Sequence, residues 1–150
     1  MRKQIELTAM LSMDKAVLHP ITNEHLDKVW DLAAPLVSRA LDYSDGKYSL
    51  EAIYEALAAR DMQLWVATLD HELIACCVTE ITIYPNKKVL TIFASAGLNL
   101  DSWLDCLTPI LHWGKSQGCQ ASEVYGRPGW ERKLARFGFE KIHTVLRARL

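Results

Sequence analysis

A long strand-rich stretch in the middle of the chain constrains the fold most. Residues 63–95 are rich in Val, Ile, Thr, Trp and Tyr, and short turns at Asp70-His71 and at Pro85-Asn86-Lys87 divide them. Short turns join neighbouring strands, so this stretch predicts an antiparallel meander. Its three expected strands cover residues 63–69, 72–84 and 88–95.

Helical spacing of apolar residues flanks this stretch on both sides. Before it, a helix is expected after Thr22, which is a suitable helix cap, and Pro35 is expected to bend that helix. A second, short helix begins near Ser49. After Gly97 the apolar period changes from strand to helix, which predicts a long helix that Gly118 terminates.

The C-terminal region predicts three further elements. A short strand is expected over residues 120–125, a brief helix over 130–137 that ends at Gly138, and a last strand from Phe139 to Leu150. The whole order indicates one α/β (α+β) domain over residues 1–150, with residues 1–17 as an N-terminal flank. A chain of 150 residues has room for one such domain and for no second one.

Composition excludes several classes of function. The formal net charge is only -1, so no overall field attracts the chain to nucleic acid or to an anionic membrane, and the sequence holds no recognised nucleic-acid motif. No apolar run is long enough to span a membrane, and the N-terminus lacks the apolar core of a signal peptide. The cytoplasm is the location expected from these absences.

Cysteine and histidine spacing predicts no metal site. The four cysteines form no CxxC pair, and the five histidines show no HExxH or other ligand spacing. We therefore expect buried free thiols.

The end of the chain, from Glu123 through Gly126-Arg127-Pro128-Gly129 to Gly138-Phe139, carries a family resemblance. It resembles the passage of GCN5-related N-acetyltransferases (GNATs) in which a strand leads through a turn into a short helix that closes with Gly-Phe. With Trp65-Val66-Ala67 and Ile74-Ala75, which look like the second and third strands of that family, the similarity spans residues 18–150. It implies a GNAT-like, mixed and mostly antiparallel sheet flanked by helices on both faces. Compact, divergent members of this kind occur among bacteriophage proteins, and the chain resembles those.

The resemblance implies an acetyl-CoA site at Ala96, Gly97, Leu98 and Asn99. GNAT enzymes hold the diphosphate of acetyl-CoA on backbone amides at the start of the long helix, because helix N-terminal amides are unpaired donors. Here the loop has one glycine and lacks the Gln or Arg of the family motif. Asp101 in the first turn would repel a diphosphate unless a Lys or Arg offsets its charge. A plain helix cap at Asn99 is the alternative interpretation.

Two residues are candidates for acid–base chemistry. The family tyrosine that protonates the departing thiolate corresponds to Leu134, which has no proton to donate, and Tyr125 could serve instead. Glu80, in an otherwise apolar strand, is the candidate general base, and Glu123 is a weaker candidate. Each also has a simpler interpretation: Tyr125 as a core or rim aromatic, and Glu80 as part of a solvated strand face.

Arg127, Trp130 and Arg132 belong to a basic cluster that could bind a phosphate or an acidic partner, with Trp130 stacking. The alternative is the solvated side of a short amphipathic helix.

Two hypotheses for function follow. One is a GNAT-like protein with lost or altered acetyl-CoA chemistry that binds another protein, located in a virion or in host cytoplasm if encoded by a phage. The other is an N-acetyltransferase that transfers the acyl group of a small-molecule donor to an amine. The lost motifs favour the first hypothesis.

Overall fold

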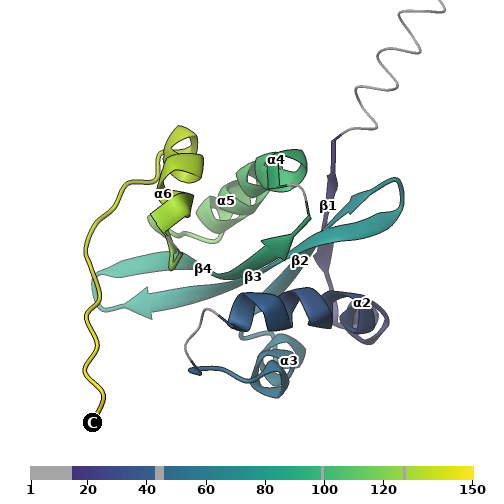
Figure 1. Cartoon of the computed structure of the whole chain (residues 1–150), viewed down its shortest axis with the longest axis horizontal. Helices are drawn as coiled ribbons and strands as arrows, with labels where there is room; N and C mark the ends of the chain where they lie inside the picture. Colours follow the sequence, from purple (N-terminus) through teal and green to yellow (C-terminus); the bar gives the residue numbers. More distant parts are fainter. Residues whose placement is uncertain (1–14, 43–45, 99, 127) are drawn as a thin grey trace, which may run out of the picture.

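A five-stranded sheet with helices on both faces forms the domain (Figure 1). The computed structural model describes residues 15–42, 46–98, 100–126 and 128–150. The strands are β1 (Val17–Ile21), β2 (Gln63–Leu69), β3 (Glu72–Tyr84), β4 (Lys87–Gly97) and β5 (Ala121–Val124). The helices are α2 (Asn23–Leu41), α3 (Leu50–Ala58), α4 (Leu100–Trp103), α5 (Leu107–Ser116) and α6 (Pro128–Leu134), with 3-10 turns η1 (Leu104–Cys106) and η2 (Ala135–Phe137). The predicted α/β (α+β) architecture is confirmed.

The meander β2–β3–β4 forms as predicted, and the sheet order follows the chain from β1 to β5. All neighbouring strands are antiparallel except β4 and β5, which are parallel. Between β3 and β4 the register shifts, since Val78 lies opposite Ala94 and Thr79 opposite Ile92. Phe93 is therefore the extra residue of a β-bulge, which bends β4 at the centre of the sheet.

Strand β1 is absent from the elements expected from sequence. It pairs with β2 at the sheet edge, with Pro20 opposite Trp65. A proline cannot donate a ladder hydrogen bond and is tolerated mainly in edge strands. Pro20 argued against a strand at the sequence level, but a proline is permitted here because β1 is an edge strand.

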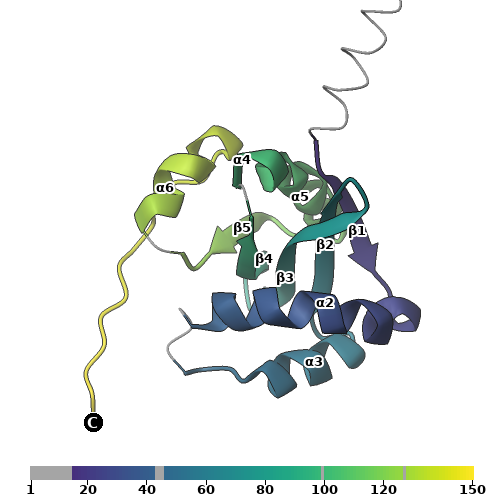
Figure 2. The ribbon, with the colours of Figure 1, turned by 45° about the vertical axis from the view of Figure 1, so that its right-hand side comes forward.

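Helices α2 and α3 cover one face of the sheet, and α4 and α5 cover the other (Figures 1 and 2). The first core cluster joins Val37 and Ile53 to sheet residues such as Leu64 and Val78. The second joins Trp65, Leu90 and other sheet residues to α5. Ser49 caps α3, because its hydroxyl accepts a hydrogen bond from the Ala52 amide. Pro35 lies inside α2 without dividing it into two elements. In the described ranges no helix is both long enough and apolar enough to cross a bilayer.

The single long helix expected after Gly97 is divided. Helix α4 has four residues, the 3-10 turn η1 follows, and α5 begins at Leu107. Pro109 explains the division, because proline has no N–H and clashes with the carbonyl four residues earlier, so it is accommodated only in a first turn. Gly118 ends α5 as predicted, with φ of 86° and the Cys119 amide bonded to the Gly114 carbonyl.

The predicted last strand from Phe139 to Leu150 is wrong. Gly138 ends the preceding turn with φ of 88°, as expected, but the chain then continues as an extended tail. Residues 140–150 are all exposed, including Ile142 at 64% and Leu146 at 89%. Alternation predicts a strand only where a neighbouring edge accepts it, and no strand of the described residues pairs with this tail.

Candidate functional site

Strands β4 and β5 diverge at one side of the sheet, where β5 is the edge strand. They pair only from Val89 to Ile92, opposite Ala121 to Val124. Beyond Ile92, β4 continues to Gly97 along β3, whereas β5 has ended. In the described part of the chain, no strand pairs with β4 on that outer edge. Its backbone amides and carbonyls there are available to an extended ligand.

Three polar residues lie in one row across the sheet near this divergence, and we call them the acid row: Glu80, Thr91 and Glu123. Glu80 lies opposite Thr91 in the β3–β4 pairing, and Thr91 lies opposite Glu123 in the β4–β5 pairing. Residues in register project from the same face, and two strand spacings place the glutamate backbones about 10 Å apart. Both glutamates are partly buried, and Thr91 is only 7% exposed.

The acid row lies on the face that carries α2 and α3. Thr79 and Ile81, the neighbours of Glu80 in β3, lie on the opposite face: Thr79 bonds Trp65, and Ile81 packs in the cluster beneath α5. Because side chains alternate along a strand, Glu80 projects from the face that carries α2 and α3. Sequence reasoning missed Thr91, whose only signal was its alternation with apolar neighbours.

Tyr125 follows the acid row directly, two residues after Glu123. Its side chain is 59% exposed. Partial burial, the Glu123 carboxylate and Tyr84 each raise the pKa of the Tyr125 phenol. The phenol therefore remains protonated at neutral pH and can donate its proton. Leu134, at the position of the family tyrosine, is buried in the core and contributes no proton.

The residues predicted to hold a coenzyme have structural tasks of their own. Ala96 and Gly97 pair with Cys76 and Ala75, and the Leu98 amide donates to the Ile74 carbonyl at 2.9 Å. Asn99, the fourth predicted residue, lies outside the described residues.

Gly97 is required by its neighbours. A Cβ at this position would lie 2.5 Å from the Ala75 Cβ and 2.8 Å from Trp103 Nε1. The Trp103 Nε1–H group is buried and has no hydrogen-bond partner among the described residues. A buried donor without an acceptor is costly, so an acceptor from a ligand would be favourable at this point. The sequence offered no signal for this unpaired donor.

Two ion pairs join the segment of α4 and η1 to the segment of α6 and η2. Lys133 Nζ lies 3.3 Å from Asp101 Oδ1, and Arg136 lies 2.9 Å from Asp105. All four side chains are largely exposed, so each ion pair contributes little to stability. Lys133 nevertheless supplies the offsetting cation that a diphosphate near Asp101 requires.

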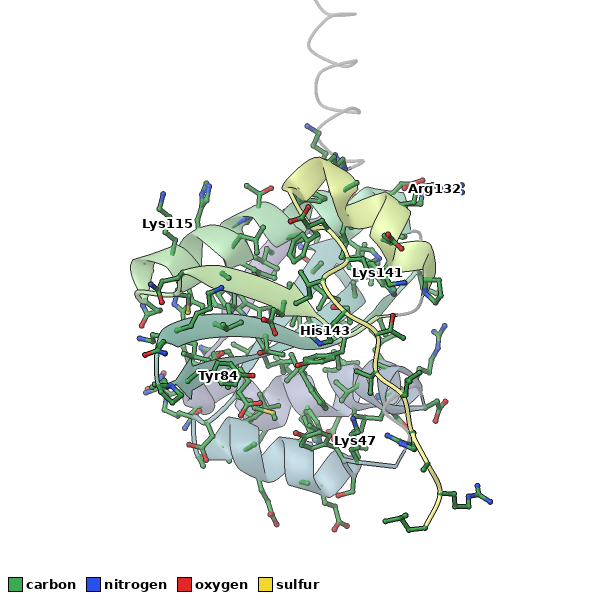
Figure 3. All side chains as sticks on the ribbon, turned by 90° about the vertical axis from the view of Figure 1, so that its left-hand side faces the viewer. Lys47, Tyr84, Lys115, Arg132, Lys141 and His143 are labelled. Atoms are coloured by element: carbon green, nitrogen blue, oxygen red, sulfur yellow. The ribbon has the colours of Figure 1, made fainter. Side chains whose placement is uncertain are left out.

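The predicted partner-binding cluster lies on α6. The Trp130 indole is half-buried, with its ring centroid 6.3 Å from that of Trp103, and it covers Gly126. Arg132 is exposed, and Figure 3 shows its side chain pointing outward from α6. Arg127 lies outside the described residues. The structure thus places Trp130 against α4, while Arg132 faces solvent.

The cysteines are free, and three of them are buried as expected. Burial and the adjacent Cys77 raise the pKa of Cys76 to about 12, and burial raises the pKa of Cys77 to about 11. Both thiols are therefore protonated and unreactive at neutral pH. Within the ranges that the structure describes, no group of His, Cys, Asp and Glu side chains could hold a metal ion.

Solved structures resemble this fold closely, although neither a protein-family model nor a curated protein sequence matches the chain. A probable acetyltransferase superposes with a TM-score of 0.67 at 15% identity, covering 89% of this chain and 96% of that one. The aminoglycoside N-acetyltransferase AAC(6')-Iy in complex with CoA gives 0.65 at 17% identity, covering 90% and 94%. An aminoglycoside acetyltransferase from an uncultured soil metagenomic sample, in complex with trehalose, gives 0.62 at 12% identity, covering 90% and 96%.

The chain therefore has a GNAT-like fold, as its sequence predicted. At these identities the likeness concerns the fold. The activity depends on the residues of the site and not on the fold alone.

Proposed function

We propose that the protein is an amine N-acyltransferase whose catalytic groups are Glu80 and Tyr125. The observation that carries the proposal is the acid row beside the divergence of β4 and β5, with Tyr125 two residues further along. This arrangement brings a carboxylate and a protonated phenol to one part of the sheet, and amide formation from a thioester needs one group of each kind. The acetyltransferase names of the similar structures support the same reaction class.

Each group has a definite task in the transfer. Glu80 accepts a proton from the attacking amine, directly or through one water. Tyr125 donates a proton to the departing thiolate, and its raised pKa keeps that proton available at neutral pH. A nitrogen–carbon bond forms as the sulfur–carbon bond breaks. Thr91 separates the two glutamates, so Glu123 is placed to bind a second positive charge.

The donor that we propose is an acyl-CoA, which when bound would supply the acyl thioester. The unpaired edge of β4 from Phe93 to Gly97 could hydrogen-bond the amide groups in the extended arm of an acyl-CoA. Trp103 Nε1–H is a buried donor that lacks an acceptor among the described residues. Lys133 offsets the Asp101 carboxylate near the start of α4. These residues fit the coenzyme, although they differ from the family loop.

The acceptor that we propose is a small amine with more than one positive charge. Glu80 and Glu123 present two carboxylates on one face, about 10 Å apart along their backbones. One carboxylate can take the reacting proton while the other pairs with a second ammonium group. A similar fold serves an enzyme named aminoglycoside N-acetyltransferase, and aminoglycosides carry several amines.

Titration with acetyl-CoA tests the proposal most directly. Binding should stabilise the protein by about 2.7 kcal/mol at a ligand concentration of a hundred times Kd. Release of free CoA should then depend on an added diamine, polyamine or aminoglycoside, more strongly than on a monoamine. An unchanged melting temperature at millimolar acetyl-CoA would contradict the proposal.

A second candidate function is protein binding without catalysis. It is favoured by the loop from Ala96 to Leu98, because the Leu98 amide is already bonded to Ile74 and Gly97 is packed against Trp103. The C-terminal tail adds exposed apolar side chains, among them Ile142 and Leu146. For this candidate, acetyl-CoA should leave the melting temperature unchanged, and a defined partner should bind the full chain but not a variant with Ile142 and Leu146 changed to Ser.

A further inference from the structure

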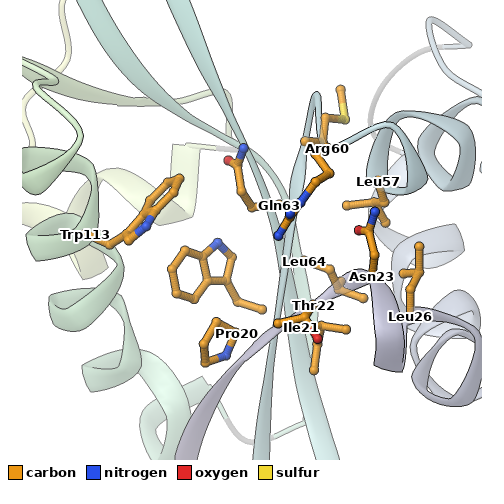
Figure 4. A pocket seen from close by; sticks show the side chains of 12 residues that line it. Pro20, Ile21, Thr22, Asn23, Leu26, Leu57, Arg60, Gln63, Leu64 and Trp113 are labelled. Carbon is orange, nitrogen blue, oxygen red and sulfur yellow. The ribbon is translucent and has the colours of Figure 1, made fainter.

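A cavity lies at the end of the sheet where β1 finishes and β2 begins (Figure 4). Its volume is about 290 Å³, close to the lower end of the range of roughly 300–1,000 Å³ that is common for small-molecule sites. It is lined by Pro20 and Gln63 from these strands, by Trp113 from α5, and by residues at the ends of α2 and α3. We call it the tryptophan pocket. The acid row takes no part in its lining.

Two indoles form one wall of the tryptophan pocket. Trp65 and Trp113 meet edge to face, with ring centroids 5.3 Å apart and planes at 71°. Trp65 is only 6% exposed, and Pro20 lies beside it in the cavity lining. Such a wall provides flat apolar contact for a planar ring.

A chain of hydrogen bonds orients the polar side of the cavity. Trp65 Nε1–H donates to Thr79 Oγ1 at 2.9 Å, and the Thr79 hydroxyl donates to Gln63 Oε1 at 2.9 Å. The Gln63 oxygen is thus engaged. Its Nε2 group has no hydrogen-bond partner among the described residues and remains a donor at the cavity.

Arg60 is the one charged residue among the twelve that line the cavity. Figure 4 shows its side chain extending towards the middle of the pocket, beside Gln63. Among the described residues its guanidinium has no ion-pair partner. A cation without a counter-ion in an otherwise uncharged cavity favours an anionic ligand.

The backbone of Arg60 adopts a left-handed conformation, as do those of Asp70 and His71. Arg60 has φ of 65° and follows α3 at the position where the chain reverses, with the Asp61 amide bonded to the Ala56 carbonyl. Glycine is favoured at this position, since other residues lose roughly 1 kcal/mol there. Arg60 is an exposed residue, so its guanidinium is accessible to a ligand that enters the cavity from solvent.

We propose that the tryptophan pocket binds a small aromatic monocarboxylate. The ring lies against Trp113 and Pro20, and the carboxylate accepts hydrogen bonds from the Arg60 guanidinium and Gln63 Nε2. A dianion is disfavoured because Arg60 is the one cation among the described residues that line the cavity. This site is independent of the proposed acyl transfer.

Calorimetry with 2-naphthoate and with its neutral analogue 2-naphthylmethanol tests the proposal without any coenzyme. The wild-type protein should bind 2-naphthoate saturably, and the alcohol about tenfold more weakly or worse. Arg60→Gly, which suits the backbone conformation and so should fold, should lower the affinity for 2-naphthoate by about tenfold. Arg60→Lys should retain part of it.

Lys115→Ala provides the matched control, because Lys115 is an exposed cation on α5 that does not line the cavity. It should leave 2-naphthoate binding unchanged. Binding should also shift the indole N–H resonance of Trp113, which is assigned by its loss in a Trp113→Phe variant. The proposal is overturned if 2-naphthoate does not bind, if the alcohol binds equally well, or if Arg60→Gly binds like wild type.

Discussion

The acid row and the tryptophan pocket are built on the same sheet but differ in how their polar groups are engaged. In the row, the carboxylates of Glu80 and Glu123 have no hydrogen-bond partners among the described residues, and the Thr91 hydroxyl between them bonds Thr82 at 3.2 Å. In the pocket, Trp65, Thr79 and Gln63 bond one another, and Arg60 is the one lining residue that carries charge.

This difference separates two kinds of site. Unengaged carboxylates near a protonated phenol can exchange protons with a ligand, which suits a reaction. In the pocket, hydrogen bonds among Trp65, Thr79 and Gln63 hold the side chains that would orient a ligand, which suits binding. The substitutions below test this contrast, in order of expected effect.

The largest effect is expected for Glu80→Gln. If Glu80 is the general base, acyl transfer to an amine should fall by about 100-fold or more, because positioned bases contribute roughly 10²–10⁴ in rate. CoA release with saturating acetyl-CoA and amine would measure it. Glu131→Gln on exposed α6 is the control and should keep the wild-type rate. If Glu80→Gln kept the wild-type rate, Glu80 would not be the general base.

Gly97→Ala should destabilise the protein by about 1–3 kcal/mol, because its Cβ would lie 2.5 Å from the Ala75 Cβ. Urea unfolding measures the loss. Gly129→Ala adds a Cβ that meets nothing within 4 Å and serves as the matched control. Equal stabilities of the two variants would mean that the neighbours of Gly97 move enough to accept a methyl group.

Tyr125→Phe should lower the acyl-transfer rate by about tenfold or more if the phenol protonates the thiolate. Because the pKa of Tyr125 is raised above its ordinary value of 10.0, the phenol stays protonated up to that pH. The wild-type rate should therefore show little loss from Tyr125 between pH 7 and about 9. Tyr84→Phe is the comparison, and a pH-independent, unchanged rate in Tyr125→Phe would exclude the acid role.

Lys133→Ala should change stability by less than about 1 kcal/mol, since both partners of its ion pair are largely exposed. It should weaken acetyl-CoA binding by a few fold at low salt, and less at high salt, because Asp101 then faces the diphosphate alone. Titrations at two salt concentrations measure this. Lys141→Ala, on the exposed tail, should bind like wild type.

Arg60→Gly should raise stability by about 0.5–1 kcal/mol, because glycine accepts the positive φ without strain. Thermal unfolding without ligand measures the gain. Asp70→Gly, at another positive φ, tests whether the gain is general. A loss of stability in Arg60→Gly would mean that the arginine supports the fold and not a ligand.

The sequence determined the local elements with strong patterns. The alternation of β3 around Glu80, the turns of the meander and Gly118 as a helix end all follow from nearest neighbours along the chain. The α/β (α+β) class and the GNAT-like fold followed from the order of those elements. The alternation along β3 was enough to place Glu80 on a partly polar face of the strand. That Glu80 and Glu123 lie in one row across the sheet did not follow from sequence.

Only the tertiary structure decided features that depend on partners distant in the chain. Pairing across β3, β4 and β5 brought Glu80 and Glu123 into one row, and α6 brought Lys133 to Asp101. The predicted last strand failed for the same reason, since alternation from Ile142 to Leu150 requires an edge that accepts it. Local pattern shows which face of an element is apolar, whereas the neighbour that covers it depends on how the whole chain packs.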